Sequence, residues 1–139
     1  MILCDTGPLI ALINRNDQFH QLCVDTLPLV LSQPLLTTWQ CMAETMYFLG
    51  KVGGNNAQDI LWEYIDDQLV IIHQPGKEEW KEIRNVMKQY KDIPMDIADA
   101  SLVVAAQHHG IRKIFTLDSH FLAYKIFNKY VFDVIPLKT

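Results

Sequence analysis

Short apolar runs alternate with longer segments of helical character along the whole chain. Runs that read as strands or extended segments occupy residues 1–4, 29–38, 68–75, 113–118 and 131–136. Apolar strands that alternate with helices predict a parallel sheet covered by helices on both faces. No internal repeat, linker or low-complexity tract interrupts the pattern. We therefore predict a three-layer α/β/α sandwich with a mostly parallel central sheet, forming a single domain over residues 1–139.

Several predicted helices have recognisable ends. Pro8 suits a first helical turn, and Thr38 is a plausible N-cap for a helix from Trp39 to about Leu49, closed by Gly50. The sequence GGNN at residues 53–56 predicts a turn before the next helix. We expect helices over residues 6–13, 18–27, 39–49, 57–67, 77–90 and 96–109.

Aromatic residues recur at helical spacing among other apolar residues in the middle of the chain. This pattern favours packing in the core over base stacking. The residues in question are Trp39, Tyr47, Phe48 and Trp62.

Composition limits the class of protein. Half of the 139 residues are hydrophobic and a fifth are charged, which is typical of a compact globular domain. The formal net charge of -4 leaves no basic footprint. Binding to nucleic acid would therefore require a local basic face or bound cations, and we expect no direct sequence-specific binding to DNA.

Cysteine usage and the N-terminus indicate a soluble cytoplasmic protein. Cys4, Cys23 and Cys41 show no CxxC spacing and lie among apolar neighbours, as buried free thiols do in a reducing compartment. The N-terminus lacks a basic region before an apolar stretch, and the apolar run 26–37 is short and broken by proline. We expect no association with a membrane.

Glu44 is the only charged side chain between Asp25 and Lys51. An ionised carboxylate on an apolar helix face is costly unless it is paired or bound to a metal. No Lys or Arg lies within reach along the same helix. We therefore expect another part of the fold to compensate Glu44.

Aspartates follow two of the predicted strands. Asp5 and Asp118 come directly after apolar runs, and ligands of open parallel sheets bind beyond the carboxyl ends of the strands. Asp99 lies in the first turn of the helix that Asp96 opens. Each of these residues also fits a simpler role: Asp5 and Asp118 as turn residues or helix caps, and Asp96 with Asp99 as a capping-box variant.

Electrostatic repulsion predicts a metal if these acids converge. Two carboxylates about 4 Å apart repel by roughly 4 kcal/mol at an effective dielectric constant near 20. A cluster of four would protonate or separate unless a cation lay between them. Ligation by carboxylates alone selects Mg²⁺ or Mn²⁺, whereas Zn²⁺ normally brings His or Cys. The histidines show no HExxH motif or similar spacing that would indicate a zinc site. The adjacent His108 and His109 fit a helix end better than a ligand pair.

The segments 3–13, 96–106 and 114–121, with the isolated Glu44, together resemble the PIN domain, and more closely the toxin ribonucleases of VapBC toxin-antitoxin pairs. These segments read LCDTGPLIALI, DIADASLVVAA and IFTLDSHF, and the similarity spans nearly the whole chain in order and spacing. The resemblance implies a PIN-like fold and an endoribonuclease that depends on Mg²⁺ or Mn²⁺ and hydrolyses single-stranded RNA.

The acidic quartet of the family matches Asp5, Glu44, Asp99 and Asp118, which the resemblance makes catalytic. As a hypothesis, the three aspartates bind the metal and Glu44 orients or deprotonates the attacking water. The hydroxyl positions match Thr6 and Thr116, which we rank as supporting residues together with Asp96. Either threonine could equally cap a local turn.

The resemblance also implies partners. A toxin of this kind has a cognate VapB-like antitoxin that covers the acidic cleft, often with an arginine, and commonly forms a homodimer. The apolar helices near the N-terminus are candidates for the interface, although the same stripes would serve a core.

The sequence departs from the family pattern in its basic residues. Many relatives carry them directly after the last aspartate, whereas the segment here reads SHFLAYK, with His120 and Lys125 as the candidates. Contacts to the RNA backbone could instead come from more distant cations. These are Arg15, Lys51, Arg112 and Lys113.

Two rival functions remain open. A Mg²⁺-dependent phosphotransfer domain also clusters acids at strand ends, but Gly7 occupies the position where the dehalogenase pattern needs a second aspartate. A receiver domain would need an acidic pair after its first strand and a lysine after a late strand, and the sequence shows neither. The non-enzymatic rival is a partner-binding module that kept the fold and lost the chemistry, and the presence of all four acids argues against it.

Overall fold

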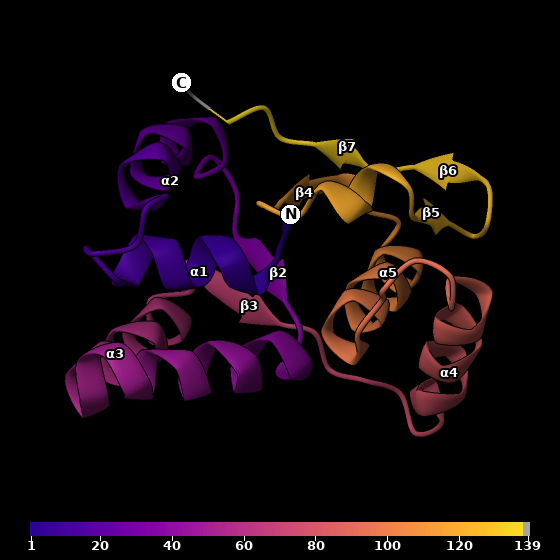
Figure 1. Ribbon diagram of the computed structural model, residues 1–139, viewed down its shortest axis with the longest axis horizontal. Helices are drawn as coiled ribbons and strands as arrows, with labels where there is room; N and C mark the ends of the chain where they lie inside the picture. The colour runs from indigo at the N-terminus through magenta and orange to yellow at the C-terminus, as the bar shows by residue number, and fades with distance from the viewer. Residues whose placement is uncertain (138–139) are drawn as a thin grey trace.

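The computed structural model describes residues 1–137 and contains a central parallel sheet (Figure 1). Residues 138 and 139 of the predicted domain lie outside this range. The helices and strands, with η marking 3₁₀ helices, are β1 (Ile2–Cys4), α1 (Thr6–Ile13), α2 (His20–Thr26), η1 (Leu27–Leu29), β2 (Leu35–Thr37), α3 (Trp39–Asp66), β3 (Val70–Ile72), α4 (Glu79–Gln89), α5 (Ile97–His109), β4 (Lys113–Phe115), η2 (Ser119–Leu122), β5 (Lys125–Ile126), β6 (Tyr130–Val131) and β7 (Asp133–Val134).

The five-stranded sheet has the order β3-β2-β1-β4-β7, and every neighbouring pair is parallel. From β1 the chain first builds outward through β2 and β3, and then returns to the other side of β1 with β4. The strand order therefore reverses between β1 and β4, which is where open α/β sheets bind their ligands. Strands β5 and β6 form a separate antiparallel pair.

Helices cover both faces of this sheet (Figure 1). On one face, Leu3, Leu36 and Ile114 pack with α4 and α5. On the other face, their neighbours along the strands pack with α1, α2 and α3, Ile2 and Phe115 among them. Because successive strand residues point to opposite faces, each short apolar strand contributes side chains to the hydrophobic cores on both faces of the sheet. The predicted three-layer α/β/α architecture is confirmed.

The predicted end of the third helix at Gly50 is wrong. Helix α3 continues past it, and the backbone leaves helical geometry at Gly54, with φ 63° and ψ -156°. Gly50 has a different role, because a Cβ there would lie 2.6 Å from the Gln58 amide nitrogen. That amide donates a hydrogen bond to the Met46 carbonyl at 2.9 Å. Glycine at position 50 thus admits a side chain across the kink.

The prediction that the aromatic residues of this region pack in the core is also wrong. Helix α3 buries Met42, Leu49 and Leu61, which leaves its other face in solvent. The exposed fractions are 42% for Trp39, 67% for Tyr47, 40% for Phe48 and 46% for Trp62. Large exposed apolar side chains that gather on one element are typical of a binding surface.

The predictions for the cysteines and for the helix cap at Thr38 agree with the structure. Cys4, Cys23 and Cys41 are buried free thiols. Thr38 caps α3 by accepting a hydrogen bond from the backbone N–H of Cys41. Among residues 1–137, no helix combines the length and the apolar character that crossing a bilayer requires.

Candidate active site at the carboxyl edge of the sheet

Asp5 and Asp118 lie beyond the carboxyl ends of β1 and β4, the neighbouring strands at the switch point. Asp5 is the N-cap of α1 and accepts a hydrogen bond from the backbone N–H of Thr6 at 2.8 Å. Asp118 is the N-cap of η2 and accepts one from the backbone N–H of His120 at 2.9 Å. Both residues therefore fill the capping role that the sequence allowed, and in each the cap uses only Oδ1.

Thr116 connects these two aspartates. Its hydroxyl donates a hydrogen bond to Asp5 Oδ2 at 2.8 Å and accepts one from the backbone N–H of Asp118 at 3.0 Å. The threonine thus fixes the rotamer of Asp5 and the start of the loop that carries Asp118. This is a positioning role, in keeping with its prediction as a supporting residue.

Asp99 enters the same region from the first turn of α5. Asp96 caps this helix by accepting a hydrogen bond from the Asp99 backbone N–H at 2.8 Å, and the Asp99 side chain returns to the Asp96 backbone, which completes a capping box. The buried Tyr124 hydroxyl donates to Asp99 Oδ2 at 3.2 Å. Sequence reasoning missed Tyr124, because a contact across 25 residues has no local signal.

The three aspartates converge. One carboxylate oxygen from each of Asp5, Asp99 and Asp118 lies within 4.8 Å of the others. They line a cleft of about 340 Å³. The other residues that line it are Thr6, Gly7, Ile10, Glu44, Asp96 and Leu117. All seven site residues singled out in the sequence therefore lie in or beside one cleft.

Burial and mutual repulsion make two of these carboxylates hard to ionise. Desolvation raises the pKa of Asp5 to about 6, with smaller contributions from the charges of Asp118 and Glu44, although hydrogen bonds from Thr116 and Thr6 oppose the shift. Desolvation likewise raises the pKa of Asp99 to about 7, and Asp96, Asp5 and Asp118 add to it. Stabilising the fully ionised cluster at neutral pH requires positive charge.

The expectation that Glu44 is buried and must be compensated is wrong. Its side chain is exposed to solvent, although it stands on a helix with many apolar residues. The apolar neighbours Tyr47 and Phe48 are exposed as well, so the face that carries Glu44 is a surface. Glu44 lines the cleft but lies outside the group of three converging aspartates.

Thr6 also lines the cleft. The residue is 5% exposed, and its Oγ1 has no hydrogen-bond acceptor or donor among the nitrogen and oxygen atoms of residues 1–137. The hydroxyl instead lies against the buried Cys41 thiol, and their contact opposes the rise that burial causes in the pKa of that thiol. Thr6 thus differs from Thr116, whose hydroxyl is fully used within the protein.

Positive charge is scarce around the cleft. Among residues 1–137 no lysine or arginine lines it, and the nearest cationic candidate is His120, whose Nδ1 lies 3.1 Å from Asp118 Oδ1. Arg112 and Lys113 stand at the amino end of β4, the edge of the sheet opposite Asp118. They are therefore poorly placed to hold a ligand in this cleft.

The donor set fits a hard divalent cation. Three carboxylates offer oxygen ligands at one point, and among residues 1–137 no lysine or arginine lines the cleft to compensate their charge. Oxygen-only ligation with room for water is the environment that Mg²⁺ and Mn²⁺ prefer. Asp5, Asp99 and Asp118 are the residues that could hold such an ion.

Sequence comparison places the chain in a family. The PIN domain model matches residues 2–126, which is most of the chain. The protein belongs to the PIN domain family, and the resemblance drawn from the motifs is confirmed at this level. No curated protein matches the chain.

Solved structures share the fold. The VapC20 toxin of Mycobacterium tuberculosis, described as cleaving the sarcin-ricin loop, superposes with a TM-score of 0.79 at 19% identity, covering 88% of this chain and 94% of that one. VapBC2 of Rickettsia felis, solved with a DNA fragment from its promoter, gives 0.66 at 14% identity, with 99% and 100% covered. FitAcB of Neisseria gonorrhoeae gives 0.57 at 16% identity, with 86% and 88% covered. At these identities the likeness is one of fold.

Proposed function

We propose that this protein is a metal-dependent endoribonuclease that hydrolyses phosphodiester bonds of single-stranded RNA, and that it acts as the toxin of a toxin-antitoxin pair. The observation that carries the proposal is the convergence of Asp5, Asp99 and Asp118 within 4.8 Å at the switch point of the sheet. Membership of the PIN family and the fold shared with VapC toxins support the same reaction class.

In this mechanism Asp5, Asp99 and Asp118 would hold Mg²⁺ or Mn²⁺, and the ion would supply positive charge to the phosphate and lower the pKa of a water. Thr116 keeps Asp5 oriented toward the cleft, and the capping box keeps Asp99 in place. Thr6 supports the site through its backbone N–H, which donates a hydrogen bond to Asp5.

Glu44 takes the proton of the attacking water. Its exposed carboxylate lines the same cleft but lies outside the three converging aspartates, so it can contact a water in the cleft without being one of the metal ligands. The water oxygen attacks phosphorus, the opposite P–O ester bond breaks, and the leaving oxygen takes a proton from solvent water, which gives a phosphate monoester and a free hydroxyl. Single-stranded RNA suits a cleft that is open to solvent.

The remaining predictions complete the proposal. The chain forms one nuclease domain and works in the cytoplasm as a homodimer, held by a cognate VapB-like antitoxin in the resting cell. One structural neighbour, VapBC2, carries the name of a VapBC pair, which supports an antitoxin partner. The exposed aromatic residues of α3, beside Glu44, offer an apolar surface for a partner that also covers the cleft.

Cleavage of a labelled single-stranded RNA tests the proposal. We expect activity with Mn²⁺ or Mg²⁺, none with excess chelator, and full recovery when the metal is restored. Asp5→Asn keeps the shape but removes a charge, and should lower the rate by about 100-fold or more, since even indirect ligand contacts are worth 10- to 100-fold.

Glu44→Gln should also inactivate the enzyme, while Glu63→Gln serves as its matched control. Glu63 is an exposed acid on the same helix that does not line the cleft. Parental activity in Asp5→Asn, or equal losses in Glu44→Gln and Glu63→Gln, would contradict the assignment.

A further inference from the structure

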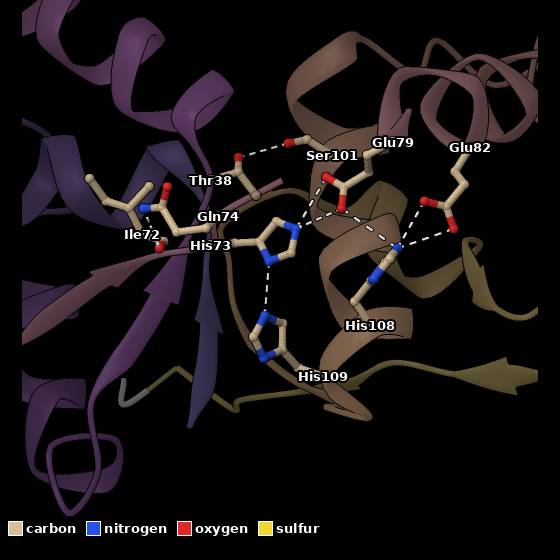
Figure 2. Close-up of polar contacts among 9 residues, drawn as sticks. All are labelled: Thr38, Ile72, His73, Gln74, Glu79, Glu82, Ser101, His108 and His109. Atoms are coloured by element: carbon tan, nitrogen blue, oxygen red, sulfur yellow. Dashed lines mark hydrogen bonds and ion pairs between the residues drawn. The ribbon is translucent and has the colours of Figure 1, made fainter. Parts of the chain in front are cut away.

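A second cluster of potential metal ligands lies away from the acidic cleft, where α4 packs on the C-terminal end of α5 (Figure 2). It contains Glu79 and Glu82 from the first turn of α4, His108 from the last turn of α5, and His73 directly after β3. The nuclease chemistry uses none of these residues. We propose that Glu79, Glu82 and His108 form a site for a borderline divalent cation of the Zn²⁺ type.

The three proposed ligands already point at one another. His108 Nε2 lies 2.8 Å from Glu82 Oε2 and 3.5 Å from Glu79 Oε1, and one ligand atom from each residue lies within 4.8 Å of the others. Ligand atoms about 2.0–2.1 Å from a tetrahedral ion lie roughly 3.3 Å apart. A small rotation of Glu82, which is 46% exposed, brings the shortest pair to that spacing.

The buried carboxylate of Glu79 is the second reason to assign a cation. Its side chain is 4% exposed, and among residues 1–137 no Lys or Arg forms an ion pair with it. Its partners are the imidazoles of His73 and His108. Burying a carboxylate is costly unless a positive charge compensates it, and two carboxylates with one neutral imidazole balance the charge of one divalent ion.

His73 and His109 orient Glu79. His73 Nε2 lies 2.8 Å from Glu79 Oε1, and His73 Nδ1 lies 2.9 Å from His109 Nε2 (Figure 2). When His73 donates a hydrogen bond through Nε2 to the carboxylate, its Nδ1 accepts a hydrogen bond from the Nε2–H of His109. This chain of hydrogen bonds fixes the His73 ring and the Glu79 carboxylate. Residues outside a metal's ligand set commonly orient the ligands in this way.

Ligand chemistry separates this site from the acidic cleft. The cleft offers oxygen atoms alone, which suit Mg²⁺ and Mn²⁺, whereas an imidazole with two carboxylates suits Zn²⁺ and its neighbours in the transition series. His108 is 40% exposed, so an ion can enter from solvent and keep a water as its fourth ligand. The bound ion would clamp α4 to α5, the helix that also carries Asp99.

Calorimetric titration with Zn²⁺ tests the proposal in an Asp118→Asn background, which disables the cleft. We expect one equivalent to bind, and we expect His108→Gln and Glu82→Gln each to weaken it by at least about tenfold. Glu78→Gln is the matched control, because Glu78 is exposed at the same helix start and pairs with Lys81 instead. It should bind Zn²⁺ as the parent does.

Thermal unfolding gives an independent readout. Zn²⁺ at 100 times its Kd should raise the Tm of the parent and of Glu78→Gln by about 5 °C or more, and leave Tm in His108→Gln unchanged. Both ligand variants change exposed side chains, so their folding can be checked without metal. No binding by the Asp118→Asn parent, or binding retained in His108→Gln and Glu82→Gln, overturns the proposal.

Discussion

At the scale of single residues, the candidate active site contains groups that are held in place at a cost in stability. Asp5 is 7% exposed and shares its surroundings with two other carboxylates. Thr116 and the backbone of Thr6 hold it by hydrogen bonds that favour the ionised form, but desolvation outweighs them. A buried carboxylate whose hydrogen bonds do not fully offset desolvation is typical of a functional site that is stabilised only when a cation binds.

This balance predicts how the stability of the metal-free protein depends on pH. The folded-state pKa of Asp5 is about 6 against 3.8 for the free group, so the folded protein holds a proton that the unfolded chain releases. The free energy of unfolding should therefore fall as pH rises from about 4 to 6 and then level off. The raised pKa of Asp99, about 7, extends this fall to neutral pH.

Asp5→Asn should remove much of this fall in the free energy of unfolding. At pH 8 in chelator the variant should be more stable than the parent by up to about 3 kcal/mol, since one pKa unit corresponds to about 1.4 kcal/mol. The gain should vanish near pH 4. Urea unfolding across this range measures it, with Asp59→Asn, an exposed acid on α3, as the control. A variant less stable than the parent at pH 8 would show that repulsion does not dominate at Asp5.

Residue-level reasoning from the sequence found the aspartates because each follows a strand or opens a helix, and these positions are visible locally. It misjudged Glu44, because burial depends on which face of α3 packs inward. It missed the cluster around Glu79, whose members come from segments up to 36 residues apart along the chain. His108 and His109 do lie at a helix end, as expected, but their contacts are tertiary.

At the scale of elements, α3 shows what glycine positions can and cannot indicate. The sequence predicted that Gly50 closes the helix and that residues 53–56 form a turn before the next helix. The break falls at Gly54, whose combination of φ 63° and ψ -156° is essentially open to glycine alone. At Gly50 the requirement is space for Gln58, and no local pattern distinguishes that from a helix stop.

Gly54→Ala should therefore destabilise the protein through the backbone. No atom lies within 4 Å of the added Cβ, so the cost is conformational, about 1–3 kcal/mol. Gly76→Ala is the control, since that position is equally open and its φ is not positive. Chemical denaturation of both variants measures the difference. Equal stability of the two variants would mean that the kink relaxes without cost.

At the scale of the whole molecule, the fold followed from the alternation of strands and helices. Two cores on opposite faces share the same strands, so that neither can form without the sheet. The sequence predicted only that Asp5 and Asp118 lie at the carboxyl ends of their strands. It did not predict the strand order, which makes β1 and β4 neighbours and brings the two aspartates together. Which strands are neighbours depends on long-range pairing that a single sequence does not display.

The shared sheet predicts one cooperative unfolding transition. Trp80 reports on α4, and Trp39 and Trp62 report on α3, which packs on the opposite face. Fluorescence of Trp80→Phe and of the double variant Trp39→Phe with Trp62→Phe should each give a urea midpoint that coincides with far-ultraviolet circular dichroism of the same protein. Separate midpoints for the two probes within one variant would indicate that the two layers unfold independently.

The central claim is that Asp5, Asp99 and Asp118 together bind a hard divalent cation. A crystal soaked in MnCl₂ tests it most directly through anomalous scattering from manganese. We predict a strong anomalous peak between the three carboxylates, at about 2.0–2.4 Å from at least two of them, and its loss in Asp118→Asn. A map with no peak at this position, at manganese concentrations that saturate other oxygen-ligand sites, would contradict the account.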